Sequence, residues 1–247
     1  MKINILNCEI DNLTLSEFLN SLQEGVVITP NVDLLIKLQY DKKFYEHFQE
    51  ADYVICDSKL VQIASKFLGT PILEKISGSD LFPAFYNYHK DNKEIKIFLL
   101  GAMDGVAQKA AENINNHIER EIIVDYFSPS YGFEKNEQEC QTIIQQINNS
   151  DATVLAVGVG SPKQEKWIMK YKNQMPNVKI FMAIGATIDF EAGNIIRAPK
   201  GMSTTGLEWL YRLLSEPKRL WKRYLVDDIP FFWLILKQKL GLYKNPW

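Results

Sequence analysis

The sequence predicts an α/β fold: a doubly wound, largely parallel sheet followed by a C-terminal helical, basic-aromatic appendage. Two observations carry this prediction. Short apolar runs alternate with helical patterns as far as about residue 200, and parallel strands need crossover helices between them. From about residue 204 the alternation stops and segments rich in Trp, Lys and Arg begin. We therefore divide the chain into an α/β core at 1–204 and an appendage at 205–247.

Seven apolar, β-rich runs are expected to form the strands. They are Lys2–Leu6, Gly25–Thr29, Tyr53–Cys56, Ile95–Leu100, Glu121–Tyr126, Ala152–Val157 and Val178–Ile184. Helical patterns fill the intervals: a capping box from Thr14 to Glu17 opens one of them, and Gly69 ends another that begins at Ser58. This order of elements is Rossmann-like, and in such folds ligands bind at the carboxyl edge of the strands.

Length and composition exclude several classes of protein. With 247 residues, 46% of them hydrophobic and 23% charged, the composition is that of a globular protein, neither disordered nor fibrous. The uncharged runs are shorter than the ~18 apolar residues of a membrane-spanning helix. The N-terminus reaches acidic residues too early for a signal peptide. Three widely spaced cysteines indicate a reducing, cytoplasmic setting rather than a disulfide framework or a zinc site.

The appendage differs from the core in charge. It holds eight Lys and Arg against four acidic residues, a net charge of +4, which leaves −6 for residues 1–204. It also holds four of the five tryptophans. Basic residues interleaved with large aromatic residues are typical of a surface that meets something anionic and partly apolar. An acidic core without a basic groove argues against nucleic acid as the partner.

Polar side chains follow two of the expected strands directly. Thr29 and Asn31 come after the second strand, and Asp57 comes after the third. At the carboxyl edge of a parallel sheet such groups face a ligand crevice rather than the core. A carboxylate before a helix can also serve as its N-cap, so the residues alone leave both roles open for Asp57.

Glycine turns follow the fourth and sixth strands. Gly101 and Gly160 each stand between a strand and a helix, where backbone N–H groups can approach a phosphate. Pro162 is expected at the first position of the helix after the sixth strand, with Lys163 and Gln164 in its first turn. A lysine suits the positive end of a helix poorly, so its presence indicates an anionic ligand there.

Two further patterns leave other chemistries open. Asp125 stands where dinucleotide-binding folds carry a ribose-binding acid, which keeps a nicotinamide-dependent oxidoreductase as an alternative. Asp189 and Glu191 form an Asp-x-Glu pair after the seventh strand, a pattern that can hold Mg²⁺. The three histidines lie within or near the ends of helical patterns, where packing is a commoner role than catalysis.

Together, the strand-end segments resemble the WecG/TagA/CpsF family of bacterial glycosyltransferases. The matching pieces run in order along the chain: Thr29-Pro30-Asn31, Asp57, Ser77–Leu81, Phe98–Gly101, Gly158–Glu165, Gly185 to Gly193, Arg197-Ala198-Pro199, and Gly206 to Tyr224. Each piece alone is unspecific, whereas the ordered set is specific. Two positions depart from the family pattern: Ser58 stands where a glycine is usual, and Lys75 where an arginine is usual. Both bear on the choice of donor.

The resemblance implies an inverting transfer of N-acetylmannosamine or a related hexose from a UDP-sugar to a polyprenyl-diphosphate-linked sugar. Such a reaction belongs to the synthesis of bacterial cell-surface polysaccharides, including teichoic acid. The resemblance also implies that no metal or other cofactor takes part. The enzyme would be cytoplasmic and peripheral on the inner face of the cell membrane. A non-catalytic membrane-surface module remains the alternative beside the oxidoreductase.

Within this resemblance each candidate residue has an expected role. Asp57 is the general base for the acceptor hydroxyl, with Thr29 and Asn31 binding sugar hydroxyls beside it. The departing diphosphate meets arginines of the appendage, since guanidinium groups bind phosphate oxygens in pairs. These arginines are Arg212, Arg219 and Arg223. The residues expected to bind substrate are Lys75, Asp80, Gly101, Gly158, Gly160, Pro162, Lys163, Gln164, Glu165, Asp189 and Arg197.

One apolar run of the appendage is expected to meet the lipid. Ile229–Leu236 is too short to span a bilayer but suits interfacial insertion, with Lys237, Lys239 and Lys244 facing anionic headgroups. A homo-oligomer would bury the same aromatic residues, and the sequence leaves that alternative open.

Overall fold

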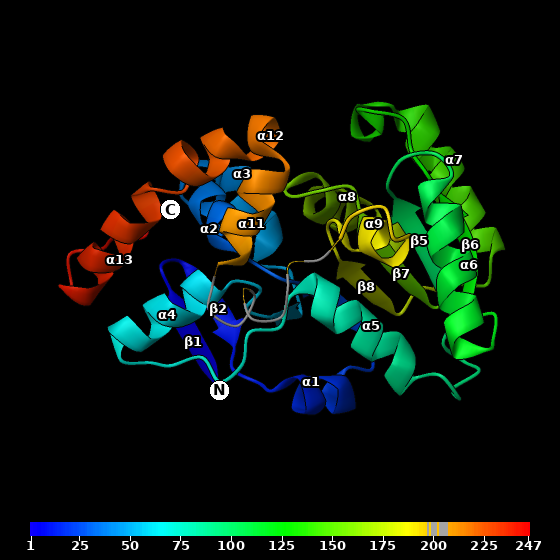
Figure 1. Cartoon of the computed structure of the whole chain (residues 1–247), viewed down its shortest axis with the longest axis horizontal. Coiled ribbons are helices and arrows are strands. Elements are labelled where there is room, and N and C mark those ends of the chain that lie inside the picture. The colour runs from blue at the N-terminus through cyan, green and yellow to red at the C-terminus, as the bar shows by residue number, and fades with distance from the viewer. Residues whose placement is uncertain (197, 199–201, 203–206) are drawn as a thin grey trace.

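The computed structural model contains a six-stranded parallel sheet, a separate two-stranded antiparallel sheet and a C-terminal group of helices (Figure 1). It describes residues 1–196, 198, 202 and 207–247, without the side chains of Glu208 and Arg219. The strands are β1 (Lys2–Ile5), β2 (Cys8–Asp11), β3 (Gly25–Ile28), β4 (Tyr53–Val54), β5 (Ile97–Gly101), β6 (Ile123–Phe127), β7 (Val154–Gly158) and β8 (Ile180–Ala183).

The helices of the core alternate with these strands. They are α1 (Leu15–Ser21), α2 (Val32–Tyr40), α3 (Lys42–Phe48), α4 (Lys59–Leu68), α5 (Gly78–Tyr88), α6 (Val106–Ile118), α7 (Glu137–Asn149), α8 (Lys163–Tyr171) and α9 (Thr187–Glu191). The expected capping box opens α1, where the Thr14 hydroxyl accepts a hydrogen bond from the Glu17 amide at 3.3 Å. Gly69 ends α4 in the left-handed conformation, as expected.

The large sheet has the strand order β4-β3-β8-β7-β5-β6, and every pairing in it is parallel. The prediction of a doubly wound, largely parallel sheet is therefore confirmed. Alternate residues of each strand face opposite layers of helices: Phe98 and Leu100 face α2, α7 and α8, whereas Ile97 and Leu99 face α5 and α6. Burial on both faces explains why these strands are continuous apolar runs in the sequence.

The first expected strand forms but does not belong to the parallel sheet. β1 turns back at Leu6, whose φ is 56°, and pairs antiparallel with β2. β2 was not expected, although its four residues alternate between buried Cys8 and Ile10 and the more exposed acidic side chains of Glu9 and Asp11. Such alternation is typical of a hairpin with one buried face. The hairpin packs its apolar face on the layer that contains α2 and α4.

The appendage consists of α11 (Glu208–Ser215), α12 (Pro217–Lys222), a π-helical turn η3 (Arg223–Asp227) and α13 (Pro230–Lys239). Figure 1 shows α11 and α12 in orange over α2 and α3, and α13 in red beyond them. Two residues of α13, Phe231 and Ile235, are buried in the core formed with α2 and α4. The expected boundary at residues 204 and 205 lies outside the described residues, but α13 packs as part of the core.

The chain beyond α13 is also fixed to the core. The Tyr243 hydroxyl donates to Gln39 Oε1 at 2.7 Å, and the Trp247 indole donates to the carbonyl of Leu38 at 2.8 Å. None of the helices in the described parts of the chain is long and apolar enough to cross a membrane.

Candidate active site

A cavity of about 430 Å³ lies at the carboxyl ends of β4, β3, β8 and β7, four strands that are neighbours in the sheet. The segments that follow these strands form its inner walls, and the appendage closes it from the other side. Of the candidate residues, those that line it are Thr29, Asn31, Asp57, Lys75, Gly160, Gln164, Glu165, Arg212 and Arg223. The carboxyl edge of the sheet is therefore the place where most of the expected chemistry meets.

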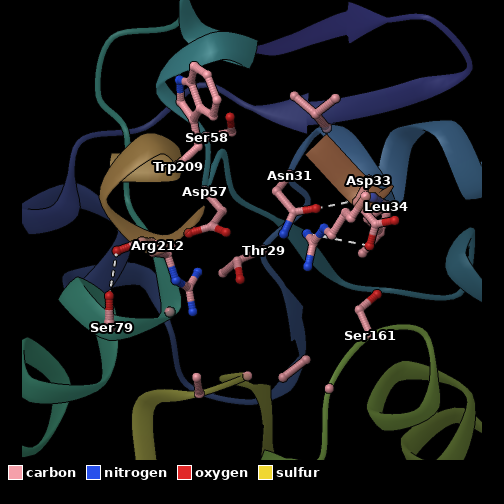
Figure 2. A pocket seen from close by; sticks show the side chains of 18 of the residues that line it. Thr29, Asn31, Asp33, Leu34, Asp57, Ser58, Ser79, Ser161, Trp209 and Arg212 are labelled. Atoms are coloured by element: carbon pink, nitrogen blue, oxygen red, sulfur yellow. Dashed lines mark hydrogen bonds and ion pairs between the residues drawn. The ribbon is translucent and has the colours of Figure 1, made fainter. Parts of the chain in front are cut away.

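The polar groups after β3 and β4 face the centre of this cavity. Figure 2 shows Thr29, Asp57 and Arg212 directed toward the same space. The N-cap of α4 is Ser58, so Asp57 stands one residue before the cap position rather than at it. Asn31 does cap a helix: its Oδ1 atom accepts a hydrogen bond from the Leu34 amide at 3.1 Å. The Asn31 Nδ2 group points into the cavity (Figure 2).

A lysine contributes positive charge to the same cavity as Asp57. Lys75 lines the cavity with its side chain only 14% exposed, and its Nζ atom lies 2.9 Å from Asp80 Oδ2. Asp80 also accepts a hydrogen bond from the Ser77 hydroxyl at 2.6 Å. Asp80 itself does not line the cavity. It holds Lys75 in place at the start of α5.

Gln164 joins the ends of β7 and β8. Its buried Oε1 atom accepts hydrogen bonds from the amides of Gly160 and Gly185, both at 3.2 Å. Its Nε2 group donates to Glu165 Oε1 at 2.9 Å, and burial raises the pKa of Glu165 above its usual range. Gln164 therefore shapes the glycine turns that border the cavity.

Five other candidate residues do not line the cavity: Gly101, Gly158, Pro162, Lys163 and Asp189. A Cβ atom on Gly101 would collide with the carbonyl of Gly158, and one on Gly158 would lie 2.6 Å from the carbonyl of Gly185, so these glycines allow adjacent strand ends to approach. Pro162 is the N-cap of α8 rather than its first residue. The Lys163 ammonium lies 5.3 Å from the centre of the Tyr131 ring.

The appendage supplies two described guanidinium groups to the cavity. The Arg212 guanidinium lies 5.9 Å from the centre of the Phe190 ring. Arg223, from η3, places Nη2 3.4 Å from Asp33 Oδ2. Arg197 lies outside the described residues, as does the side chain of Arg219.

The residues that suggested a nicotinamide cofactor or Mg²⁺ have other partners in the structure. Asp125 Oδ2 accepts a hydrogen bond from Gln146 at 2.9 Å, and Asp125 is not among the residues that line the cavity. Glu191 accepts a hydrogen bond from the Tyr86 hydroxyl at 3.0 Å, which ties α9 to α5. In the described part of the chain no group of three or more His, Cys, Asp or Glu is arranged to hold a metal ion.

Two of the acidic residues that line the cavity were missed in the sequence analysis. Asp33 and Asp228 both line it and are each 7% exposed. Burial raises the pKa of Asp228 to about 7, against the opposing effect of the Arg223 charge. In the sequence, Asp33 has the pattern of an acidic residue in the first turn of a helix. Asp228 has the pattern of one of two adjacent surface acids. Only the packing of η3 on α2 brings them together.

Comparison with known proteins gives a consistent result. The family model described as "Glycosyl transferase WecG/TagA/CpsF family" matches residues 3–245. A Bacillus spizizenii protein named N-acetylglucosaminyldiphosphoundecaprenol N-acetyl-beta-D-mannosaminyltransferase is 28% identical over 208 residues, which cover 84% of this chain and 77% of the relative. A Staphylococcus aureus protein of the same name is 27% identical over 253 residues, covering 98% of this chain and 95% of the relative.

Proposed function

The chain belongs to the WecG/TagA/CpsF family of glycosyl transferases, and from that premise we propose that it transfers N-acetylmannosamine or a related hexose from a UDP-sugar to a polyprenyl-diphosphate-linked N-acetylglucosamine. The curated relatives carry names that state this kind of acceptor and this transferred sugar. The reaction proceeds with inversion and serves the synthesis of a cell-surface polysaccharide such as teichoic acid.

One observation supports the chemistry most directly: a carboxylate and several cationic groups line the same cavity. Asp57 comes from the end of β4, Lys75 from the segment before α5, and Arg212 from the appendage. Inverting transfer needs a base for the incoming hydroxyl and positive charge for the departing diphosphate. This cavity offers both within one enclosure.

The residues divide the transfer step between them. Asp57 takes the proton of the acceptor hydroxyl as its oxygen bonds to the anomeric carbon of the donor. The bond from that carbon to the diphosphate oxygen breaks, and its electron pair leaves with UDP. Lys75 and Arg212 stabilise the charge that grows on this leaving group. Thr29 and the Asn31 amide bind sugar hydroxyls beside the base.

An exposed apolar surface supports a lipid-linked acceptor. It is formed by Leu225, Val226, Ile229, Phe232, Trp233 and Leu236, whose exposed fractions lie between 38% and 58%. Phe232 also lines the cavity, so this surface continues into the site. Lys237 stands over the Trp233 ring, its Nζ atom 5.4 Å from the ring centre, where it can meet anionic headgroups. This surface supports our proposal that the protein associates peripherally with the membrane, and we propose that it does so at the inner face.

A screen of UDP-sugars with a soluble, short-chain polyprenyl-diphosphate-N-acetylglucosamine tests the proposal. We expect UDP release together with a disaccharide product of the corresponding mass, with UDP-N-acetylmannosamine as the first donor to try. The same screen with Asp57→Asn controls for contaminating transferases. Wild-type protein that transfers no sugar from any UDP-sugar would refute the proposed function.

A further inference from the structure

One wall of the cavity contains buried polar atoms without hydrogen-bond partners. They are Ser161 Oγ, Glu165 Oε2, Arg223 Nε and Asp228 Oδ1, and all four residues line the cavity. The described residues contain eight such side-chain atoms, so half of them gather here. A buried polar group without a partner is costly to a fold, and a concentration of them in one wall indicates a ligand that completes them.

These four residues, which we call the Asp228 wall, stand together around Asp33. Asp33 Oδ2 lies 2.7 Å from Lys37 Nζ and 3.4 Å from Arg223 Nη2. Lys37 also donates to the carbonyl of Ser161 at 3.4 Å, and Figure 2 shows the Ser161 side chain directed toward Asp33. The Ser161 hydroxyl lies near Glu165 without forming a hydrogen bond of good geometry.

The charges of this wall do not suit a diphosphate. Three carboxyl groups (Asp33, Glu165 and Asp228) face two cations (Lys37 and Arg223), and both cations already pair with Asp33. Asp33 thus engages both cations, and any ionised fraction of Glu165 and Asp228 would repel a phosphate. For a metal ion, the Arg223 guanidinium group already occupies Asp33 at 3.4 Å, and the described residues contain no group of three or more His, Cys, Asp or Glu arranged to hold one.

The unpartnered atoms suit a neutral ligand that both donates and accepts hydrogen bonds. Arg223 Nε and the Ser161 hydroxyl can donate, while Glu165 and Asp228 offer carboxyl oxygens. Aromatic rings line the same cavity, among them Trp209 and Tyr224, whose centres are 6.1 Å apart. Vicinal hydroxyls, an acetamido group and apolar C–H faces are the features of a sugar ring.

We propose that the Asp228 wall is a sugar subsite, which binds the hydroxyl or acetamido groups of the ring transferred or of the ring that accepts it. The inference rests on the proposed function, and it assigns the two ends of the cavity different tasks. Lys75 and Arg212 bind the diphosphate, and the Asp228 wall binds the neutral sugar ring. Because Asp228 and Arg223 belong to the appendage, this subsite is complete only when η3 packs on α2.

Monodeoxy analogues of the donor and acceptor sugars test the proposal in combination with Asp228→Ala and Ser161→Ala. For wild-type protein we expect one analogue to lower kcat/KM by about 10- to 100-fold, because it leaves a buried group unpaired. In the variant that lacks the matching partner, the same analogue should cost less than about threefold. The analogue concerned tells whether the subsite holds the donor or the acceptor ring.

Asp227→Asn is the matched control, because Asp227 is exposed and does not line the cavity. This variant should discriminate between the sugar substrate and its deoxy analogue as strongly as wild type does. Should Asp228→Ala fail to fold, Ser161→Ala decides alone, since this change removes a single hydroxyl oxygen. Unchanged discrimination in every folded variant overturns the inference, as does an equal loss on all analogues.

Calorimetry separates this inference from the proposed function. The ratio of the Kd values for sugar substrate and deoxy analogue should fall toward unity in Asp228→Ala or Ser161→Ala, whether or not transfer occurs. A wild-type protein that binds these ligands with discrimination but transfers nothing would refute the function and keep the subsite. If the protein transfers sugar but the ratio of Kd values is the same in wild type and variants, the function stands and the subsite is refuted.

Discussion

At the scale of single residues, two carboxyl groups of the cavity stand in different surroundings. Asp57 follows β4 and faces Thr29 and Arg212. Asp228 belongs to the appendage and is buried where η3 packs on α2, and burial raises its pKa to about 7. The cavity thus has one carboxyl group after a strand end, where we propose that a base acts, and a second one, that of Asp228, whose pKa is raised to about 7.

Replacing Asp57 tests its role as the base. We expect Asp57→Asn to lower kcat by at least ~10²-fold while the Kd for UDP changes little, since a base acts mainly in the transition state. Steady-state kinetics and calorimetry measure the two quantities. Asp91→Asn, at an exposed turn after α5, is the control. Near-normal turnover of Asp57→Asn would remove Asp57 from the mechanism.

Asp228 predicts a pH dependence of stability. Burial raises its pKa above the value of 3.8 to about 7, with Asp33 and Asp227 acting in the same direction and Arg223 and Lys37 against it. The folded state therefore holds this proton more tightly than the unfolded state. The stability it contributes is complete below about pH 4 and is lost as the pH rises through about 7. Asp228→Asn keeps a neutral side chain at every pH. The melting temperature of this variant, relative to wild type, should therefore rise between about pH 4 and pH 7 and stay higher above pH 7. An offset that is constant with pH would contradict the assignment.

The cations of the cavity predict transfer without a metal ion. Lys75 and Arg212 line the cavity and are the cations that we propose to meet the departing diphosphate. We expect the initial rate of transfer in excess EDTA to equal the rate without it. If EDTA abolishes transfer and Mg²⁺ or Mn²⁺ restores it, Asp189 and Glu191 become the residues to test next.

At the scale of elements, α13 has two apolar sides with different tasks. Phe231 and Ile235 are buried against α2 and α4, whereas Ile229, Trp233 and Leu236 remain exposed. The sequence could not distinguish them, because the helix is apolar nearly all round and its periodicity shows no polar face. Only the position of α2 and α4 decides which side is covered.

A pair of variants separates these two sides. Ile229→Ser with Trp233→Ser should weaken association with anionic liposomes and leave the melting temperature nearly unchanged, because both side chains are more than half exposed. Phe231→Ala should cost about 3–5 kcal/mol of unfolding free energy, because its ring is buried. Liposome sedimentation and thermal unfolding measure the two effects. A change from dimer to monomer in the double variant would show that the exposed side joins two copies of the chain.

At the scale of the whole molecule, the sequence predicts the sheet and half of the site. Thr29, Asp57 and Gly160 follow strands, so parallel pairing brings them to one edge whatever the details of packing. Asp33 and Asp228 could not be predicted in this way. They come together through the contact of η3 with α2. No periodic pattern in the sequence predicts that contact.

Removing the appendage tests how far it belongs to the core. A chain cut to residues 1–204 loses Phe231 and Ile235, and it exposes the faces of α2 and α4 that α13 covers. We expect a melting temperature well below that of the full chain, measured by circular dichroism. The double variant of exposed residues described above is the control, since it leaves the buried side of α13 intact. A truncated chain as stable as the whole would show that the core folds without α13.

The position of β8 has a consequence for synthesis on the ribosome. This strand lies between β3 and β7, yet it is the last strand of the chain to emerge. Until it does, β3 with β4 and β5 with β6 and β7 are two half-sheets whose inner edges have no neighbour. Unpaired apolar edges invite aggregation. The nascent protein therefore depends on the arrival of Ile180–Ala183, and a translational pause before these four residues would prolong the exposure of both edges.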